Sequence, residues 1–366
     1  MGNTTDKATI LVVDDDPINL RLLQEILKDN YTPYLAPSGE RALAFLKNRR
    51  PDLILLDVEM PDMNGYDVIR AIKKDPSRRD IPVIFLTGLE GRDKEQEALD
   101  LGAVDYILKP ISAGIVKARA GLHIELEAYR ANLERMVEIR TRQLGQTQDA
   151  ILDMLANMTS YRDNETGSHI KRTTIYSEIL VNNLREKNHP DYQIDDEYAE
   201  GIVKSAKLHD IGKVAISDNI LLKPAKLTQL EFEVIKKHTV LGAQIIDDAI
   251  EGLGDVSFFL SVAREIIISH HEKWNGSGYP NNLSGTEIPL SGRIMAIADV
   301  YDALISERPY KKSFSHEESV EILKKDAGSH FDPYLIELSK DVIEHFEEIA
   351  LIHKDEPFLK REIYAE

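Results

Sequence analysis

Five short apolar segments alternate with amphipathic ones over the first 110 residues, and this alternation limits the possible folds more than any other feature. The apolar segments cover residues 9–14, 31–36, 53–58, 82–87 and 104–109. Helical patterns lie between them, near 17–29, 38–48, 63–73 and 92–100. Such alternation is typical of a doubly wound parallel sheet. We therefore predict an α/β domain with five parallel strands, and Pro33 predicts an edge position for the second strand.

Strand patterns end at Pro110, and the chain beyond residue 160 has helical patterns almost throughout. They cover residues 168–187, 195–209, 228–250, 255–271, 290–306, 315–326 and 332–349. A series of helices without intervening strands predicts a second, all-α domain, which we expect to be a helical bundle.

The segment between these two parts, from about residue 112 to 158, is poor in proline and rich in Leu, Glu, Arg and Gln. Its apolar positions follow the 4-3-4-3 spacing of a coiled-coil seam: Leu122, Leu126, Tyr129, Leu133 and Met136. Arg140 interrupts the seam. We interpret the segment as a signalling helix that pairs two protomers into a homodimer. The alternative is an amphipathic connector that packs on its own chain.

The amino-acid composition indicates which residues could bind a metal ion and where in the cell the protein is expected. The 366 residues include no cysteine, so a metal ion must be bound by His, Asp and Glu, which favours iron, manganese, zinc or magnesium. A formal charge of −18, from 45 Lys and Arg against 63 Asp and Glu, disfavours a nucleic-acid-binding surface. No apolar run approaches the ~18 residues of a membrane span, and the N-terminus lacks a signal-peptide core. We expect a cytoplasmic protein that binds neither DNA nor a membrane.

Polar residues stand at the carboxyl ends of four predicted strands. Asp14 and Asp15 end the first strand, Asp57 the third, Thr87 the fourth and Lys109 the fifth. Because ligands bind at this edge of an open α/β sheet, we expect the five residues to share one crevice. Clustered carboxylates suit Mg²⁺, whereas a hydroxyl and an ammonium suit a phosphoryl group. For the Asp14–Asp15 pair alone, a helix cap is the alternative.

Residues 8–120 resemble the receiver domain of response regulators. The resemblance rests on the motifs VVDDDP, LILLDVEMPDMNG, VIFLTG and DYILKP. It implies that Asp57 accepts a phosphoryl group from a sensor histidine kinase. It also implies that Asp14, Asp15 and Asp57 bind Mg²⁺ together with the backbone carbonyl of Glu59.

The same resemblance implies roles for three further residues of the sheet edge. Thr87 and Lys109 would contact the phosphoryl oxygens, and Tyr106 matches the aromatic switch residue of the family. The Lys109–Pro110 bond matches a peptide bond that the family holds cis.

Residues able to bind metal ions gather in the helical half of the chain. They are Glu165, His169, His209, Asp210, His238, His270, His271 and Asp299. A lone histidine near a helix end is usually a cap, but the pairs His209–Asp210 and His270–His271 are harder to dismiss. Since adjacent side chains on a helix diverge by ~100°, both members of a pair would face one site only around a cluster larger than one ion. Eight ligands also exceed the three or four of a catalytic zinc site, so we predict two or three metal ions that share bridging carboxylates.

Residues 150–350 resemble the HD-GYP subgroup of the HD superfamily. The matching motifs are RDNETGSHIKR, LHDIGKVAI, ILLKPAKLTQLEFEVIKKHT, HHEKWNGSGYP, IADVYDALISERPYKKS and HFDP. The resemblance implies an all-α bundle, cyclic di-GMP as the substrate and a centre of two or three iron or manganese ions. The eight residues named above match its ligands, with Asp210 as the bridge and Glu165 as the extra carboxylate of members with three metals.

The resemblance also implies residues that bind the substrate. Lys213 matches the lysine of the HD-x-x-K pattern, which is placed to stabilise or protonate at the phosphate. Arg308 and Lys311 match cations that grip the substrate phosphates; the alternative is a solvated basic turn. Tyr279 is expected to contact the substrate at the edge of the site.

The signature loop of the family is formed by Gly276, Gly278, Tyr279 and Pro280, and it is linked to partner contacts. Asn275 replaces the usual Asp before the first loop glycine, and Asn282–Leu283 replaces the usual Gly-Leu. These departures bear on loop shape and partner choice more than on chemistry.

Together these patterns predict an N-terminal tail (1–7), a receiver domain (8–120), a linker helix (121–158), an HD-GYP domain (159–350) and a C-terminal tail (351–366). The expected activity is phosphorylation-controlled hydrolysis of cyclic di-GMP to pGpG or GMP by a metal-bridging hydroxide, with Lys213, Asp210 and His209 as catalytic residues. One alternative is a phosphodiesterase for another cyclic dinucleotide. The other is a slow enzyme that mainly binds cyclic di-GMP or partners such as GGDEF-domain proteins.

Overall fold

The structure is a computed structural model that describes residues 7–88, 96, 99–163, 167–253, 257–306 and 313–354. The chain divides into two compact units, residues 1–142 and 143–366, which are described separately. Three predicted site residues, Glu165, Arg308 and Lys311, lie outside the described residues, as do most of the two predicted tails.

The first unit is built on a five-stranded sheet with the strand order β2-β1-β3-β4-β5. The strands are β1 (Thr9–Val13), β2 (Thr32–Ala36), β3 (Leu53–Asp57), β4 (Val83–Thr87) and β5 (Asp105–Leu108). All four neighbouring pairs are parallel. The predicted doubly wound sheet is confirmed, and Pro33 does lie in an edge strand, β2.

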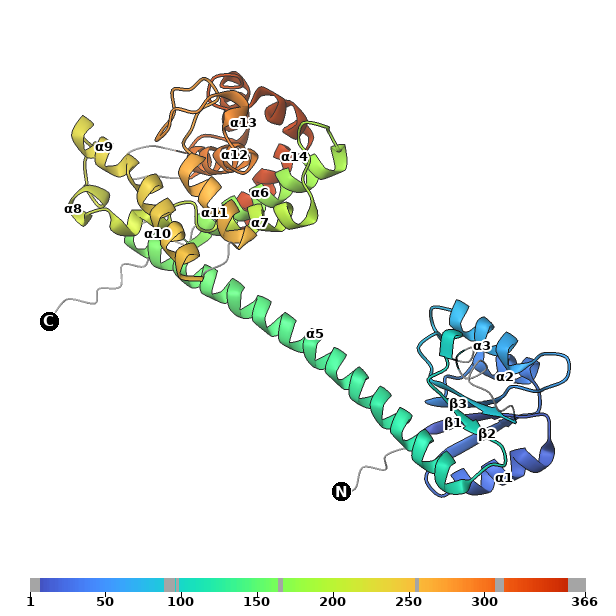
Figure 1. The fold of residues 1–366 in the computed structure, drawn as a ribbon. Helices are drawn as coiled ribbons and strands as arrows, with labels where there is room; N and C mark the ends of the chain where they lie inside the picture. The colour runs from blue at the N-terminus through green and yellow to red at the C-terminus, as the bar shows by residue number, and fades with distance from the viewer. Residues whose placement is uncertain are drawn as a thin grey trace. The chain divides into compact units, whose positions relative to one another are not determined.

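Helices cover both faces of this sheet (Figure 1). On one face α2 (Gly39–Leu46) and α3 (Gly65–Lys74) pack on residues such as Leu11 and Leu56. On the other face α1 (Pro17–Leu27) and the first turns of α5 pack on Ile10 and Leu55. Because both faces are buried, the central strands are apolar throughout, as their sequences show.

Local sequence sets where many of the helices begin. The side chains of Asp16, Ser38 and Asn64 accept hydrogen bonds from backbone N–H groups at the starts of α1, α2 and α3. Thr228 and Ser315 form capping boxes at the starts of α9 (Gln229–Lys236) and α13 (His316–Lys325). Short polar side chains at these positions satisfy N–H groups that have no partner within the helix, which is why the predicted starts are accurate.

A 51-residue helix, α5 (Ala113–Asp163), begins in the first unit and ends in the second. Val116 and Ala120 are buried against the sheet, and Leu152 and Ala156 are buried in the second unit. The predicted linker and its boundaries at 120/121 and 158/159 fall inside this one helix, so those boundaries stay predictions. Among the described residues, none of the helices has the length and apolar character that crossing a membrane would require.

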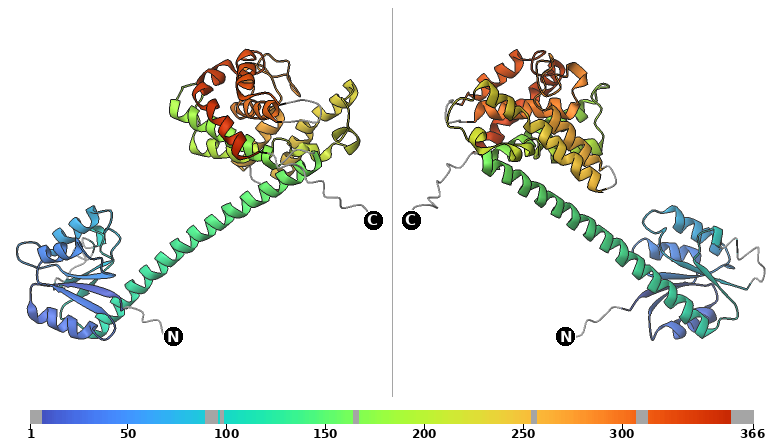
Figure 2. Two further views of the ribbon diagram at one scale, coloured as in Figure 1. Left: turned by 180° about the vertical axis from the view of Figure 1, so that it is seen from behind. Right: turned by 60° about the vertical axis from the view of Figure 1, so that its left-hand side comes forward.

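The second unit is all-α in its described part, as both views in Figure 2 show. After α5 it contains α6 (Gly167–Lys187), α7 (Asp196–Ala206), η1 (Ile211–Ala215), α8 (Asp218–Leu221), α9 (Gln229–Lys236), α10 (His238–Leu253), α11 (Phe258–Ser269), η2 (Gly285–Glu287), α12 (Leu290–Ile305), α13 (His316–Lys325) and α14 (Pro333–Ile352). Its main core joins α6, α7, α11, α12 and α14, with Tyr176, Tyr301 and Phe346 in mutual ring contact at the centre.

The predicted helix over 228–250 is wrong in one respect, because it is two helices, α9 and α10, that meet at Lys237. The break places His238 at the start of α10, where its ring Nδ1 lies 2.8 Å from the carbonyl oxygen of Ile235. The short elements η1 and α8 were also missed, since three- to five-residue helices carry too little periodicity to be recognised.

Candidate metal centre and phosphoacceptor site

Three carboxylates meet at the carboxyl edge of the receiver sheet. Oxygens of Asp14, Asp15 and Asp57 lie within 4.8 Å of one another. The Lys109 ammonium lies 2.9 Å from Asp57 Oδ2 and 3.2 Å from Asp14 Oδ2, and both acids are buried. This is the convergence that the strand ends predict, and it offers oxygen ligands to a hard cation such as Mg²⁺.

Electrostatics at this edge depends on Lys109. Burial raises the pKa of Asp57, and the hydrogen bond from Lys109 opposes that effect without cancelling it. Burial lowers the pKa of Lys109, but Asp57 and Asp14 outweigh it, so the net shift is upward. Lys109 therefore stays charged and compensates the buried carboxylates.

The other predicted receiver residues are close to this cluster in the sheet. The backbone carbonyl of Thr87 accepts a hydrogen bond from the Lys109 amide at 2.8 Å. Arg119 lies over the Tyr106 ring at 5.6 Å. Glu59 is exposed just after β3, and the Lys109–Pro110 bond is cis. The signalling roles of these residues stay predictions.

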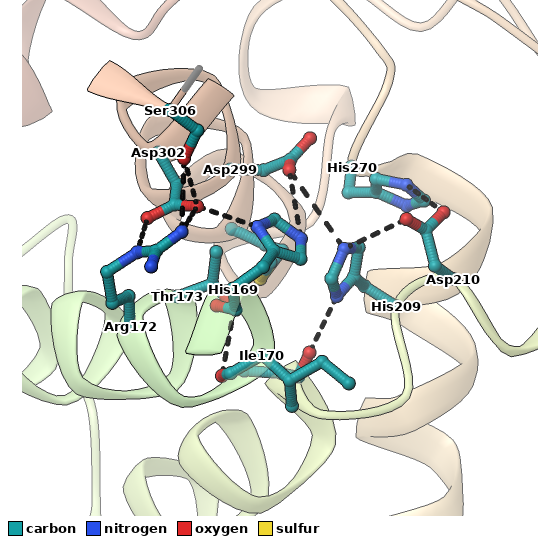
Figure 3. A network of polar contacts seen from close by, with 12 residues as sticks. His169, Ile170, Arg172, Thr173, His209, Asp210, His270, Asp299, Asp302 and Ser306 are labelled. Atoms are coloured by element: carbon teal, nitrogen blue, oxygen red, sulfur yellow. Dashed lines mark hydrogen bonds and ion pairs between the residues drawn. The ribbon is translucent and has the colours of Figure 1, made fainter. Parts of the chain in front are cut away.

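In the second unit, the ends of several elements bring the predicted metal ligands together (Figure 3). His169 lies on the first turn of α6 and Asp299 lies within α12, whereas the other ligands stand on turns or at helix ends. These are His209 and Asp210 after α7, His238 at the start of α10, and His270 and His271 after α11.

Two groups of ligands share Asp210. Ligand atoms of His169, His209 and Asp210 lie within 4.8 Å of one another, and so do those of Asp210, His238, His270 and His271. Asp299 belongs beside the first group, because its Oδ1 is 3.8 Å from His169 Nε2 and 4.0 Å from His209 Nε2. The arrangement fits two neighbouring metal positions with Asp210 between them.

The adjacent pairs differ from the sequence prediction in their local structure. His270 and His271 follow the end of α11, and both reach the same ligand group, so the ~100° divergence of neighbours within a helix does not apply to them. His209 and Asp210 likewise lie on a turn. Helical spacing is therefore not a reason for more than one ion at His270 and His271, and a centre of two or three ions stays a prediction, which the shared Asp210 supports.

Each of three histidines presents its Nε2 atom to the centre because its Nδ1 atom is bound elsewhere. The Nδ1 atoms of His209, His238 and His270 lie 2.8 to 3.0 Å from backbone carbonyl oxygens. Their buried Nε2 atoms, and Asp210 Oδ1, have no hydrogen-bond partner among the described residues. His209 Nε2 and His238 Nε2 are each 3.2 Å from an oxygen of Asp210. Two ligand atoms bound to one ion at about 2.1 Å and at right angles are about 3 Å apart, so the donor set fits a metal ion.

The pKa shifts of most of the candidate ligands also favour the protonation states that bind a metal ion. Burial lowers the pKa of His270 to about 3 and holds the pKa of His271 well below its usual range. Burial would raise the pKa of Asp210, but Lys213 and nearby imidazoles outweigh it and hold that pKa well below the ordinary value. His209 is an exception, because Asp210 and Asp299 outweigh burial and raise its pKa. Neutral imidazoles around an ionised carboxylate are what a divalent cation requires.

Lys213 connects the centre to the end of α5. Its Nζ atom lies 2.8 Å from Asp210 Oδ2 and also donates to Asp163, the last residue of α5. Arg162, one residue earlier, donates to the backbone oxygens of Val214 and Ile216. The turn that carries Lys213 is thus attached directly to the linker helix.

The signature loop closes one side of the centre. The Tyr279 ring lies 4.8 Å from the His271 ring, and burial raises the pKa of Tyr279. A Cβ atom on Gly278 would lie 2.3 Å from the Lys273 amide nitrogen, and Gly276 has φ +79°, so both glycines are needed for this path. The buried Glu272 accepts hydrogen bonds from the Asn281 and Leu283 amides, a role that we did not predict.

The comparisons with known proteins identify both domains. The sequence model of the response regulator receiver domain matches residues 10–120, and that of the HD domain matches residues 135–335. A Vibrio cholerae protein named "Probable cyclic di-GMP phosphodiesterase" is 43% identical over 96% of this chain and 81% of its own length. The cyclic di-GMP phosphodiesterase response regulator RpfG of Xanthomonas campestris is 32% identical over 92% and 89%. The 3'3'-cGAMP-specific phosphodiesterase 2 of Vibrio cholerae is 40% identical over 62% and 39%.

Fold, site and sequence matches define a response regulator whose second domain is a metal-dependent phosphodiester hydrolase. The chain belongs to the family of cyclic di-GMP phosphodiesterases in which a receiver domain precedes an HD domain. The two sequence resemblances are thereby confirmed, while the roles of individual residues stay predictions.

The backbones of η1 and α10 are in close contact at Gly212, so a larger residue there should destabilise the fold. A Cβ atom on Gly212 would lie 1.9 Å from the carbonyl oxygen of His238. Gly212→Ala should therefore lower the free energy of unfolding by about 1–3 kcal/mol, measured by chemical denaturation. Gly145→Ala in α5 is the control, because nothing lies within 4 Å of its added Cβ and alanine favours helix. Equal stability of the two variants would contradict the contact.

Proposed function

We propose that the protein hydrolyses cyclic di-GMP at the centre around Asp210. The observation that carries this proposal is the pair of candidate ligand groups that share one partly buried carboxylate, Asp210, with the Lys213 ammonium 2.8 Å from it. A centre with two adjacent cation positions is suited to displacement at phosphorus, where both the attacking and the leaving oxygen need stabilisation. Relatives along most of the chain, which are named as cyclic di-GMP phosphodiesterases, support this substrate.

In this proposal the bound metal ions, Asp210, Lys213 and Tyr279 each have a separate role in the reaction. Divalent iron or manganese, when bound, would supply Lewis acidity and lower the pKa of water. Asp210 would hold the shared position, and His270, whose pKa burial lowers to about 3, would be neutral and able to bind a metal ion. Lys213 offsets negative charge as it develops on the phosphate and is placed to protonate the leaving 3′ oxygen. Tyr279 limits access beside His271. Linear pGpG is the first product, and a second cleavage would give GMP.

A second substrate has specific support. A protein that is 40% identical over 62% of this chain is named as specific for 3'3'-cGAMP, a different cyclic dinucleotide. The two substrates share the phosphodiester ring and differ in one base. Arg308 and Lys311, which we propose as phosphate ligands, would not distinguish them.

Purified full-length protein loaded with Mn²⁺ or Fe²⁺ should convert cyclic di-GMP to pGpG or GMP, which nucleotide chromatography resolves. Asp210→Asn should reduce the rate at least about a hundredfold, because it removes the shared ligand. Asp247→Asn, which alters an exposed ion pair with Arg264, is the matched control. Faster cleavage of 3'3'-cGAMP would reassign the substrate. Intact nucleotides under every condition would favour a protein that binds cyclic di-GMP or GGDEF-domain partners.

We also propose that phosphorylation of Asp57 by a sensor histidine kinase controls the centre through α5. Support comes from the first and last turns of that helix: Val116 packs under the receiver sheet, and Asp163 binds Lys213. Addition of beryllofluoride, which mimics a phosphoryl group on an aspartate, should change the hydrolysis rate of the wild-type protein. The rate of Asp57→Asn should not respond. Equal responses of the two proteins would rule out control through Asp57.

A second copy of the chain is the partner we propose for α5. The predicted seam residues are all exposed, from 43% for Leu133 to 61% for Leu122 and Tyr129, and apolar side chains at this spacing favour pairing of two helices. Leu133→Asp should therefore shift the protein from dimer to monomer in light scattering after gel filtration. Ala131→Asp places the same charge two residues earlier, away from the seam, and should leave the dimer intact. A monomeric wild-type protein would refute this partner.

The predicted location of the protein, which stays a prediction, is the cytoplasm.

A further inference from the structure

His169 differs from three other histidines of the centre in what supports its ring. Backbone carbonyls of their own segments accept from His209, His238 and His270. The Nδ1 atom of His169 instead lies 2.8 Å from Oδ2 of Asp302, a carboxylate on another helix, α12 (Figure 3). A carboxylate that accepts from the far nitrogen of a metal-binding imidazole fixes its tautomer and makes its Nε2 a stronger ligand than a carbonyl does.

Asp302 is itself held in place by Arg172. The guanidinium donates from Nε to Asp302 Oδ1 at 2.6 Å and from Nη2 to Oδ2 at 2.8 Å, a two-point contact that fixes the plane of the carboxylate. Ser306 Oγ adds a contact to Asp302 Oδ2 at 3.3 Å. The Arg172 side chain is 3% exposed and the Asp302 side chain is 1% exposed. Arg172 also donates to the backbone oxygen of His353 at 2.8 Å, so the end of α14 restrains the arginine in turn.

The spacing along the two helices explains how the four groups meet. His169 and Arg172 are three residues apart on α6, and Asp299 and Asp302 are three residues apart on α12. Residues at this spacing share one face of a helix. Each helix therefore presents one ligand of the centre and one member of the supporting ion pair toward the other helix.

A purely structural role for the ion pair explains less of this arrangement. Buried ion pairs add little net stability, because the loss of hydration offsets much of the attraction, and apolar residues of similar volume often stabilise as well or better. An apolar pair could join α6 to α12, but it could not accept a hydrogen bond from His169 Nδ1. The orientation of the His169 ring, by contrast, requires a carboxylate at position 302 and a guanidinium that holds it in place.

We propose that Asp302 and Arg172 are positioning residues of the metal centre, which hold His169 with Nε2 toward His209 and Asp299 and so set the metal affinity of that half of the centre. The inference rests on the metal-dependent hydrolase function proposed above, but not on the identity of the nucleotide. The half formed by His238, His270 and His271 shows no contact with this ion pair among the described interactions and is linked to it only through the centre itself, so its affinity should depend less on the ion pair.

The test compares Mn²⁺ binding by metal-depleted, full-length proteins in equilibrium dialysis with elemental analysis. Asp302→Asn keeps the size of the side chain and removes its charge. It should weaken one class of Mn²⁺ positions by roughly 10- to 100-fold and weaken the other class by a smaller factor. Arg172→Lys keeps the charge but loses the two-point contact, and it should shift the same class in the same direction by a smaller factor.

A matched control variant distinguishes a loss of Mn²⁺ affinity from a general loss of protein stability. Asp332 is also buried and pairs with Arg293 at 2.6 Å, away from the ligands, so Asp332→Asn should lower the Tm without changing Mn²⁺ affinity in the folded protein. Unchanged Mn²⁺ binding in Asp302→Asn, an equal loss from both classes of position, or the same loss of Mn²⁺ affinity in Asp332→Asn would overturn the inference. Wild-type protein that binds Mn²⁺ but cleaves no nucleotide would overturn the proposed function instead.

Discussion

The metal centre of the second unit is arranged around one partly buried carboxylate, Asp210, which lies between two groups of histidines. An ionised carboxylate away from water is costly unless cations or hydrogen bonds compensate it. Lys213 provides one positive charge, and the neutral imidazoles offer lone pairs that oppose one another unless an ion lies between them. The side chains around Asp210 thus form a donor set suited to a metal ion, and they come from several helix ends.

Most of the predicted metal ligands that the structure describes lie at helix ends or in turns rather than within helices. Four of the described ligands follow a helix or lie in a turn, where the side-chain direction is free of the 100° step between neighbours on a helix. Such ends must come close together, and Gly212 and Gly242 permit it, because a Cβ on either would collide with the opposite segment. Backbone contact of this kind leaves little freedom for His238, whose carbonyl lies against Gly212.

The linker helix has a different surface in each part of its length. Its first turns are buried under the receiver sheet, its last turns bury Leu152 and Ala156, and the seam from Leu122 to Met136 is exposed. Its final residues, Arg162 and Asp163, hold the turn that carries Lys213. The last residue of this helix therefore contacts the lysine that lies 2.8 Å from Asp210 Oδ2, and Asp153 and Leu152 contact Lys207 and Leu208 just before His209.

The sequence by itself determined the strands, most helices, the acidic edge of the receiver and the set of metal-ligand candidates, because periodicity, caps and ligand chemistry are local properties. Only the tertiary structure decided which ligands share Asp210, that the predicted helix over 228–250 breaks before His238, and that Asp302 with Arg172 supports His169. These depend on contacts between segments far apart in the chain, such as the 130 residues between Arg172 and Asp302, where packing rather than local preference sets the geometry.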